Sequence, residues 1–94
     1  PMLSPTITAQ LIRQVTEAAP DARGDEALSL ADTLTARERE VAIAVGQGSS
    51  NAEIATDLHM SVATVKAHIS HIFTKLDVTN RVQVAICMHE AGLL

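Results

Sequence analysis

The stretch SNAEIATDLHMSVATVKAHISHIFTKL, residues 50–76, predicts two helices joined by a very short turn. Ser50 and Glu53 form a capping box at the start of the first helix, and Ser61 is placed to cap the second. Ala55 supplies the small residue that two closely crossing helices need at their contact. Helices joined by about three residues cross steeply, which is the helix-turn-helix arrangement.

The second of these helices, residues 62–76, has one apolar and one polar face. The apolar positions recur at helical spacing and predict a buried stripe of Val65, Ile69, Ile72 and Leu76. The opposite face carries Ala63, Lys66, Ala67, Ser70 and Thr74. Because residues 59–76 contain no acid, this face could lie against DNA without charge repulsion. It could equally be the solvated face of a helical bundle, and spacing alone leaves both interpretations open.

Helical patterns also flank this pair. Thr35 and Glu38 form another capping box, and the glycines of residues 46–48 supply a stop for the helix that follows it. A last helix is expected over about residues 80–91, where Gly92 halts it. Residues 34–94 are therefore predicted to form an all-α domain of four helices.

The amino-terminal third of the chain has a different character. A helix is expected over about residues 5–19 and is ended by Pro20. Residues 20–33 are acidic and rich in small residues, a composition typical of a linker. Residues 1–33 are accordingly interpreted as an interdomain linker with one helix, and residues 34–94 as the domain. Because the chain starts with proline rather than methionine, we interpret it as a piece of a longer protein.

The composition agrees with packed helices. Hydrophobic residues make up 47% of the 94 residues, yet Phe73 is the only aromatic one, whereas sandwiches and barrels favour aromatic and β-branched residues. The net charge of −4 is unevenly divided, since residues 1–58 carry −5 and residues 59–94 carry +1. The overall negative charge therefore does not exclude a nucleic-acid partner for the second part.

Several classes of function find no support in the sequence. No membrane span or secretory signal is visible, and the single Cys87 excludes a disulfide framework, which together favour a cytoplasmic protein. No cofactor or metal is expected, because the four histidines, His59, His68, His71 and His89, lack the spacing of a zinc site. No enzyme is expected, since the chain has neither a glycine-rich phosphate loop nor a nucleophile elbow.

Several short segments carry a family resemblance: Leu34–Val41, Gly48–Ala55, Thr64–His68, Lys75–Leu76 and Arg81. In order and without gaps, they resemble the LuxR/NarL/FixJ-type DNA-binding domain. The resemblance implies the output domain of a two-component response regulator, a transcription factor whose receiver domain is missing from this chain. It implies sequence-specific binding of double-stranded DNA, with a recognition helix over about residues 62–76 in the major groove. Ala36 replaces the family's usual proline and Asp77 its frequent glycine, which affects turn geometry only.

The residues expected to contact DNA are Asn51, Thr64, Lys66, Ala67, Ser70, His71 and Lys75. Lys66 is the expected base reader, and the resemblance places Ala67 and Ser70 toward the groove. Thr64 and Lys75 are expected at phosphates. Asn51 either contacts a phosphate or caps its helix, and His71 flanks the recognition face.

The last helix has more apolar surface than a single core contact requires. Val82, Ile86 and His89 form a second stripe at helical spacing, which the resemblance implies is the contact of a homodimer. Alternatively, the linker helix or neighbouring turns cover this stripe within one molecule. A helical protein–protein interaction module that binds no DNA is the alternative function, and the salt dependence of binding distinguishes the two.

Overall fold

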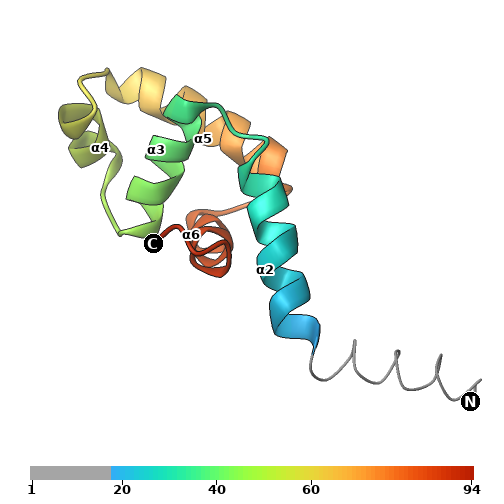
Figure 1. Cartoon of the computed structure of the whole chain (residues 1–94). Helices are drawn as coiled ribbons and strands as arrows, with labels where there is room; N and C mark the ends of the chain where they lie inside the picture. The colour runs from blue at the N-terminus through green and yellow to red at the C-terminus, as the bar shows by residue number, and fades with distance from the viewer. Residues whose placement is uncertain (1–17) are drawn as a thin grey trace, which may run out of the picture.

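The computed structural model describes residues 18–94, which form five α-helices and no strand within that range (Figure 1). The helices are α2 (Ala18–Ala31), α3 (Ala36–Gly46), α4 (Asn51–Asp57), α5 (Val62–Leu76) and α6 (Arg81–Glu90). The predicted all-α class and the four helices expected in residues 34–94 are confirmed.

Short polar side chains start the helices where the sequence predicts. The capping boxes Thr35–Glu38 and Ser50–Glu53 are both complete, with each side chain bonded to the other residue's backbone amide. Ser61 caps α5 by accepting from the amide of Thr64 at 3.0 Å. These bonds satisfy backbone donors that the first turn of a helix leaves without partners.

The turn between α4 and α5 brings the two helices into the predicted helix-turn-helix arrangement. His59 has a φ of 58°, a left-handed conformation that redirects the chain. The amide of Met60 then donates to the carbonyl of Ala55 at 2.9 Å and closes the end of α4. Because the turn is this short, α5 has little freedom relative to α4.

One core holds the helices together. α3 packs against α5 and α6, while α4 packs mainly against α5 (Figure 1). Within residues 22–94 the core contains fifteen buried apolar residues: Ala27, Ala31, Leu34, Val41, Ala42, Val45, Ile54, Ala55, Val65, Ile69, Ile72, Leu76, Val84, Cys87 and Met88. The predicted stripe of α5 is therefore buried in full, which leaves its opposite face to the solvent.

The link from α5 to α6 explains one departure from the family pattern. Asp77 ends α5 with φ 57° and ψ 50°, the left-handed conformation that glycine adopts without steric cost. Aspartate is among the residues that tolerate it. Asn80 then caps α6 by accepting from the amide of Gln83 at 2.9 Å. Asp77 thus fulfils the role of the expected glycine.

The predicted end of a helix at Pro20 was wrong, because most of residues 20–33 belong to α2, while their role as an interdomain linker stays a prediction. Pro20 does not end a helix; it lies in the first turn of α2, where its missing N–H has no intrahelical partner to lose. The helix expected over about residues 5–19 lies outside the described residues, apart from its last two positions, which begin α2.

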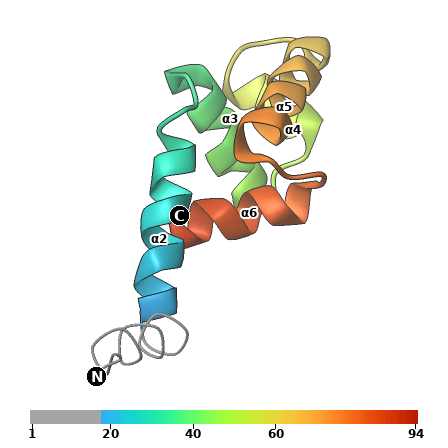
Figure 2. The ribbon, with the colours of Figure 1, turned by 90° about the vertical axis from the view of Figure 1, so that its right-hand side faces the viewer.

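Gly24 was expected to interrupt a helix, but it lies within α2, at the point where α2 comes close to α6. A Cβ on Gly24 would lie 3.3 Å from the carbonyl oxygen of Glu90, so its absence lets α2 lie close to the end of α6 (Figure 2). Arg23 adds an ion pair to Glu90 at 3.5 Å, and Ala27 is buried beside Cys87. α2 therefore packs on the helices of residues 34–94, although the predicted division at residue 33 stays a prediction.

Candidate nucleic-acid interface

The exposed face of α5 contains the residues that the sequence predicts there. Ala63, Lys66, Ala67, Ser70 and Thr74 are all exposed, and Val65, Ile69, Ile72 and Leu76 on the opposite side are buried. The Thr74 hydroxyl donates to the carbonyl of Ser70 at 3.3 Å and so stays close to the helix. The side chains on this face are short apart from Lys66. A flat face of this kind allows a close approach to another surface.

Charge on this face comes mainly from Lys66. No ion pair involves Lys66 within residues 22–94, and α5 itself contains no acid. A cation without a local carboxylate can pair with a phosphate or donate to a base edge. The surroundings of Lys66 therefore suit the predicted contact with DNA.

Thr64 and Asn51 lie at the starts of α5 and α4. The Thr64 side chain is exposed and accepts from the Ser61 hydroxyl at 2.9 Å, so it takes part in the cap of α5. Asn51 is not a cap, because Ser50 has that role. Instead, Asn51 Oδ1 accepts from Arg81 Nη1 at 2.6 Å. Capping, the alternative expected for Asn51, is thereby excluded.

Arg81 is a residue whose role sequence reasoning missed. Its guanidinium also donates to the carbonyl of Ser49 at 2.8 Å and so joins the start of α6 to the start of α4. The partners are separated by about thirty residues in the sequence, and a pattern along the chain does not reveal such a contact. Arg81 fixes the orientation of the Asn51 amide, since a guanidinium only donates hydrogen bonds.

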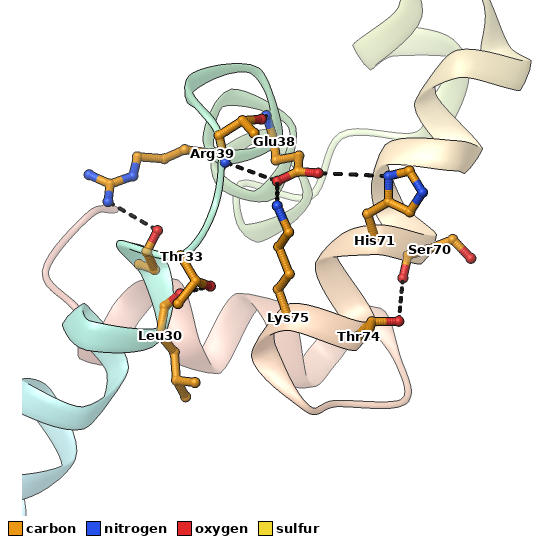
Figure 3. Close-up of polar contacts among 10 residues, drawn as sticks. Leu30, Thr33, Glu38, Arg39, Ser70, His71, Thr74 and Lys75 are labelled. Atoms are coloured by element: carbon orange, nitrogen blue, oxygen red, sulfur yellow. Dashed lines mark hydrogen bonds and ion pairs between the residues drawn. The ribbon is translucent and has the colours of Figure 1, made fainter.

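Lys75 and His71 meet a carboxylate that the sequence did not associate with them. Lys75 Nζ donates to Glu38 Oε1 at 2.7 Å, and His71 Nδ1 lies 3.7 Å from Glu38 Oε2 (Figure 3). Glu38 comes from the first turn of α3 and is buried, whereas the His71 side chain is 67% exposed. Lys75 remains a predicted phosphate contact, but one of its three donors is already engaged.

The burial of Glu38 and its partners act on its pKa in opposite directions. Burial alone raises the pKa of the carboxyl group. The hydrogen bonds from Lys75 and from the Thr35 amide, together with the Lys75 charge, more than offset that effect, so the pKa lies below its ordinary value of 4.5. Glu38 is therefore ionised at neutral pH and held as an ion pair.

We expect Glu38 to contribute to the acid sensitivity of the fold. Because its pKa is lower in the folded than in the unfolded chain, its contribution to stability is present above the ordinary pKa and is lost as the pH falls through the folded value. Urea unfolding of wild type and Glu38→Gln at about pH 7 and about pH 3 measures this effect. The wild type should lose more stability on acidification than Glu38→Gln does. Equal losses in the two proteins would contradict the assignment.

The predicted dimer stripe lies on the outer side of α6. Val82 is 67% exposed, Ile86 is 50% exposed, and His89 is exposed as well, while Val84 and Met88 on the other side are buried. The linker helix that could cover this stripe lies outside the described residues apart from its last two positions, and α2 leaves Val82 and Ile86 exposed. α2 packs on the side of Cys87 and Glu90, with a shallow groove between Leu30 and Ile86.

The described part of the chain contains neither a metal site nor a helix that could span a membrane. No group of three or more histidine, cysteine or acidic side chains is placed to bind a metal ion in residues 18–94. None of the five helices is both long and apolar enough to span a bilayer. Cys87 is buried against α2, and burial, with help from the charges of Glu90 and Glu26, raises the pKa of its thiol.

Comparison with known proteins gives a consistent result. A family model described as bacterial regulatory proteins, luxR family, matches residues 32–88. The transcriptional regulatory protein LiaR of Bacillus subtilis is 40% identical over 63 residues, which cover 67% of this chain and 30% of LiaR. The response regulator protein VraR of Staphylococcus aureus is 40% identical over 65 residues, 69% of this chain and 31% of VraR. The chain thus spans just under a third of the length of these relatives.

A solved structure resembles the fold over a longer stretch. Full-length FixJ from B. japonicum superimposes with a TM-score of 0.74 at 27% identity. The match covers 95% of this chain and 46% of the FixJ chain. The structural match therefore covers more of this chain than residues 32–88, which the family model matches.

Proposed function

The chain belongs to the luxR family of bacterial regulatory proteins, and from this premise we propose that it binds double-stranded DNA sequence-specifically, with α5 in the major groove. As a LuxR-type helix-turn-helix domain it is a DNA-binding module of transcription regulation. The observation that carries the finer proposal is the exposed face of α5, which is free of carboxylates and bears Lys66. A helix of this kind fits the major groove, where each base pair presents a distinct set of donors and acceptors.

Individual residues have different roles in this proposal. Lys66 reads a base edge, and the small side chains of Ala67 and Ser70 allow close approach, with contact to a thymine methyl group or through water. The remaining contacts go to phosphates and fix the register of the protein on the duplex, and they come from Asn51, Thr64, His71 and Lys75.

Pairing of two copies through α6 is the second part of the proposal. The exposed stripe of Val82, Ile86 and His89 lies on the far side of α6 from the core. Two copies joined across a two-fold axis there present two copies of α5 to adjacent half-sites. Three side chains form a small contact, so we expect pairing to be weak in solution and stronger on DNA.

The relatives suggest the kind of complete protein to which this chain belongs. LiaR and VraR are named as a transcriptional regulatory protein and a response regulator, and the matched segment is under a third of each. We propose that this chain is the output domain of such a regulator in the cytoplasm, and that a receiver domain belongs to the complete protein. The domain binds DNA and catalyses no reaction in this proposal.

Salt dependence separates this function from a helical protein–protein module. Binding to a random-sequence duplex should weaken steeply as salt rises, because phosphate contacts release counterions. Fluorescence anisotropy at several salt concentrations measures the slope. Steep salt dependence supports DNA binding, while no measurable binding at low salt would favour the protein-interaction module.

A further inference from the structure

Glu38 is the one buried charged residue in residues 22–94, and its carboxylate has more partners than a helix start requires. Oε1 accepts from the Thr35 amide at 2.9 Å, which completes the capping box of α3. The same oxygen accepts from Lys75 Nζ, and Oε2 faces His71. The capping of α3 alone therefore explains neither the burial of Glu38 nor its contacts with α5.

The two partners lie on one flank of α5. His71 and Lys75 are four residues apart, so they are neighbours along a single line of the helix surface. At 3.6 residues per turn this line falls between the buried stripe and the exposed face that contains Lys66 and Ser70. In Figure 3, both side chains extend from α5 toward Glu38 on α3. A contact at this flank resists rotation of α5 about its own axis.

Apolar packing prevents large rotations of α5, because these would expose the buried stripe, but it constrains small rotations less. The buried stripe of α5 consists of Val, Ile and Leu side chains, whose contacts with the core have no preferred direction. The Glu38–Lys75 pair, in contrast, is directional and lies where water is largely excluded on the carboxylate side. Its geometry suits it to limit small rotations of α5.

On the basis of the proposed function, we propose that Glu38 is a positioning residue for sequence recognition, which acts through Lys75 and His71 and does not itself touch DNA. Reading base edges requires side chains held to within about half an ångström by supporting contacts. Sequence-independent affinity needs only positive charge near phosphates. Loss of Glu38 should therefore reduce discrimination between sequences rather than affinity in general.

The variant Glu38→Gln, compared with Glu40→Gln, tests this inference. Glu40 lies on the same helix but is exposed and pairs with Arg37 at 2.6 Å, so its variant removes the same charge without touching α5. Two probes are used: a duplex that the wild type selects from a random library, and a scrambled duplex of equal length and composition. The readout is the ratio of the two affinities, because a lower folded fraction weakens both equally and leaves the ratio unchanged.

We expect the ratio to fall by about tenfold in Glu38→Gln, the size of a disturbed base contact, and to stay at the wild-type value in Glu40→Gln. If Glu38→Gln lost the same factor of affinity for both duplexes, Glu38 would only support the fold, and the inference would be overturned. Equal gains on both would do so as well, because Glu38 would then only repel phosphates. Absence of any preference in the wild type would instead contradict the proposed function.

A second variant keeps the test decisive if Glu38→Gln does not fold. The double variant Glu38→Met, Lys75→Met replaces the pair with apolar side chains of similar length, a change that is often neutral or stabilising for buried ion pairs. It should show the same loss of discrimination while remaining folded by circular dichroism. An unchanged ratio in this protein would overturn the positioning role.

Discussion

Replacement of Lys66 by alanine should remove most of the sequence-specific affinity for DNA and leave the fold intact. Lys66 is exposed and forms no ion pair within the described residues, so its removal breaks no ion pair there. A side chain that reads a base edge contributes roughly 1–3 kcal/mol, which corresponds to a loss of about fivefold to more than a hundredfold. Titration of the selected duplex at moderate salt measures the loss.

The matched control for Lys66→Ala is Arg23→Ala. Arg23 is also a well-exposed cation, but it lies on α2 and pairs with Glu90. Both variants reduce the net charge by the same amount, so a general electrostatic effect would weaken binding equally. We expect a large loss only for Lys66→Ala. Wild-type affinity of a folded Lys66→Ala protein would exclude Lys66 as a base reader.

Introduction of a charge at Ile86 should abolish cooperative loading of two copies onto DNA. In the proposed dimer, Ile86 lies near its own symmetry mate, so Ile86→Glu places two carboxylates together and removes apolar contact. A folded monomer should remain, because the Ile86 side chain is half exposed and outside the core. Loss of pairing removes the gain from effective concentration, so affinity for a two-half-site duplex should fall by about a hundredfold.

Leu28→Glu is the matched control for this variant. Leu28 is 41% exposed on α2, similar to the 50% of Ile86, and the substitution introduces the same charge outside the stripe. Sedimentation and gel-shift measurements on both proteins report oligomeric state and cooperativity. If Ile86→Glu still loads two copies cooperatively, the stripe of Val82, Ile86 and His89 is not the dimer contact.

Local signals made much of this fold predictable from the sequence. A capping box places its partners three residues apart, so the starts of α3 and α4 can be read directly from the sequence and agree with the structure. The same holds for Ser61 at α5 and for the alternation of buried and exposed positions along that helix. Interactions within one or two turns depend on local sequence alone.

The predictions that failed depended on contacts between distant segments. Pro20 and Gly24 suggested a break in the helix because both residues usually interrupt helices. Pro20 is tolerated in a first turn, and Gly24 is favoured by its close approach to Glu90. The sequence around α2 contains no sign that α6 will pack against it.

In the candidate site, too, features set by the local sequence were predicted, whereas contacts between distant residues were not. Exposure of Lys66, Ala67 and Ser70 followed from helical periodicity. The pairing of Lys75 with Glu38 joins residues 37 positions apart, and that of Arg81 with Asn51 joins residues 30 apart. Glu38 was assigned to the capping box, a role that it does have, and nothing nearby in the sequence indicates that it is also buried against α5.

The central claim is that the exposed face of α5 is the surface that meets DNA. Backbone amide chemical shifts, recorded while the selected duplex is titrated into the isotope-labelled protein, test it residue by residue. The account predicts the largest changes at Lys66, Ala67 and Ser70, with little change on the exposed side of α2 at Asp25 and Leu28. Changes concentrated on α2, with α5 unaffected, would contradict it.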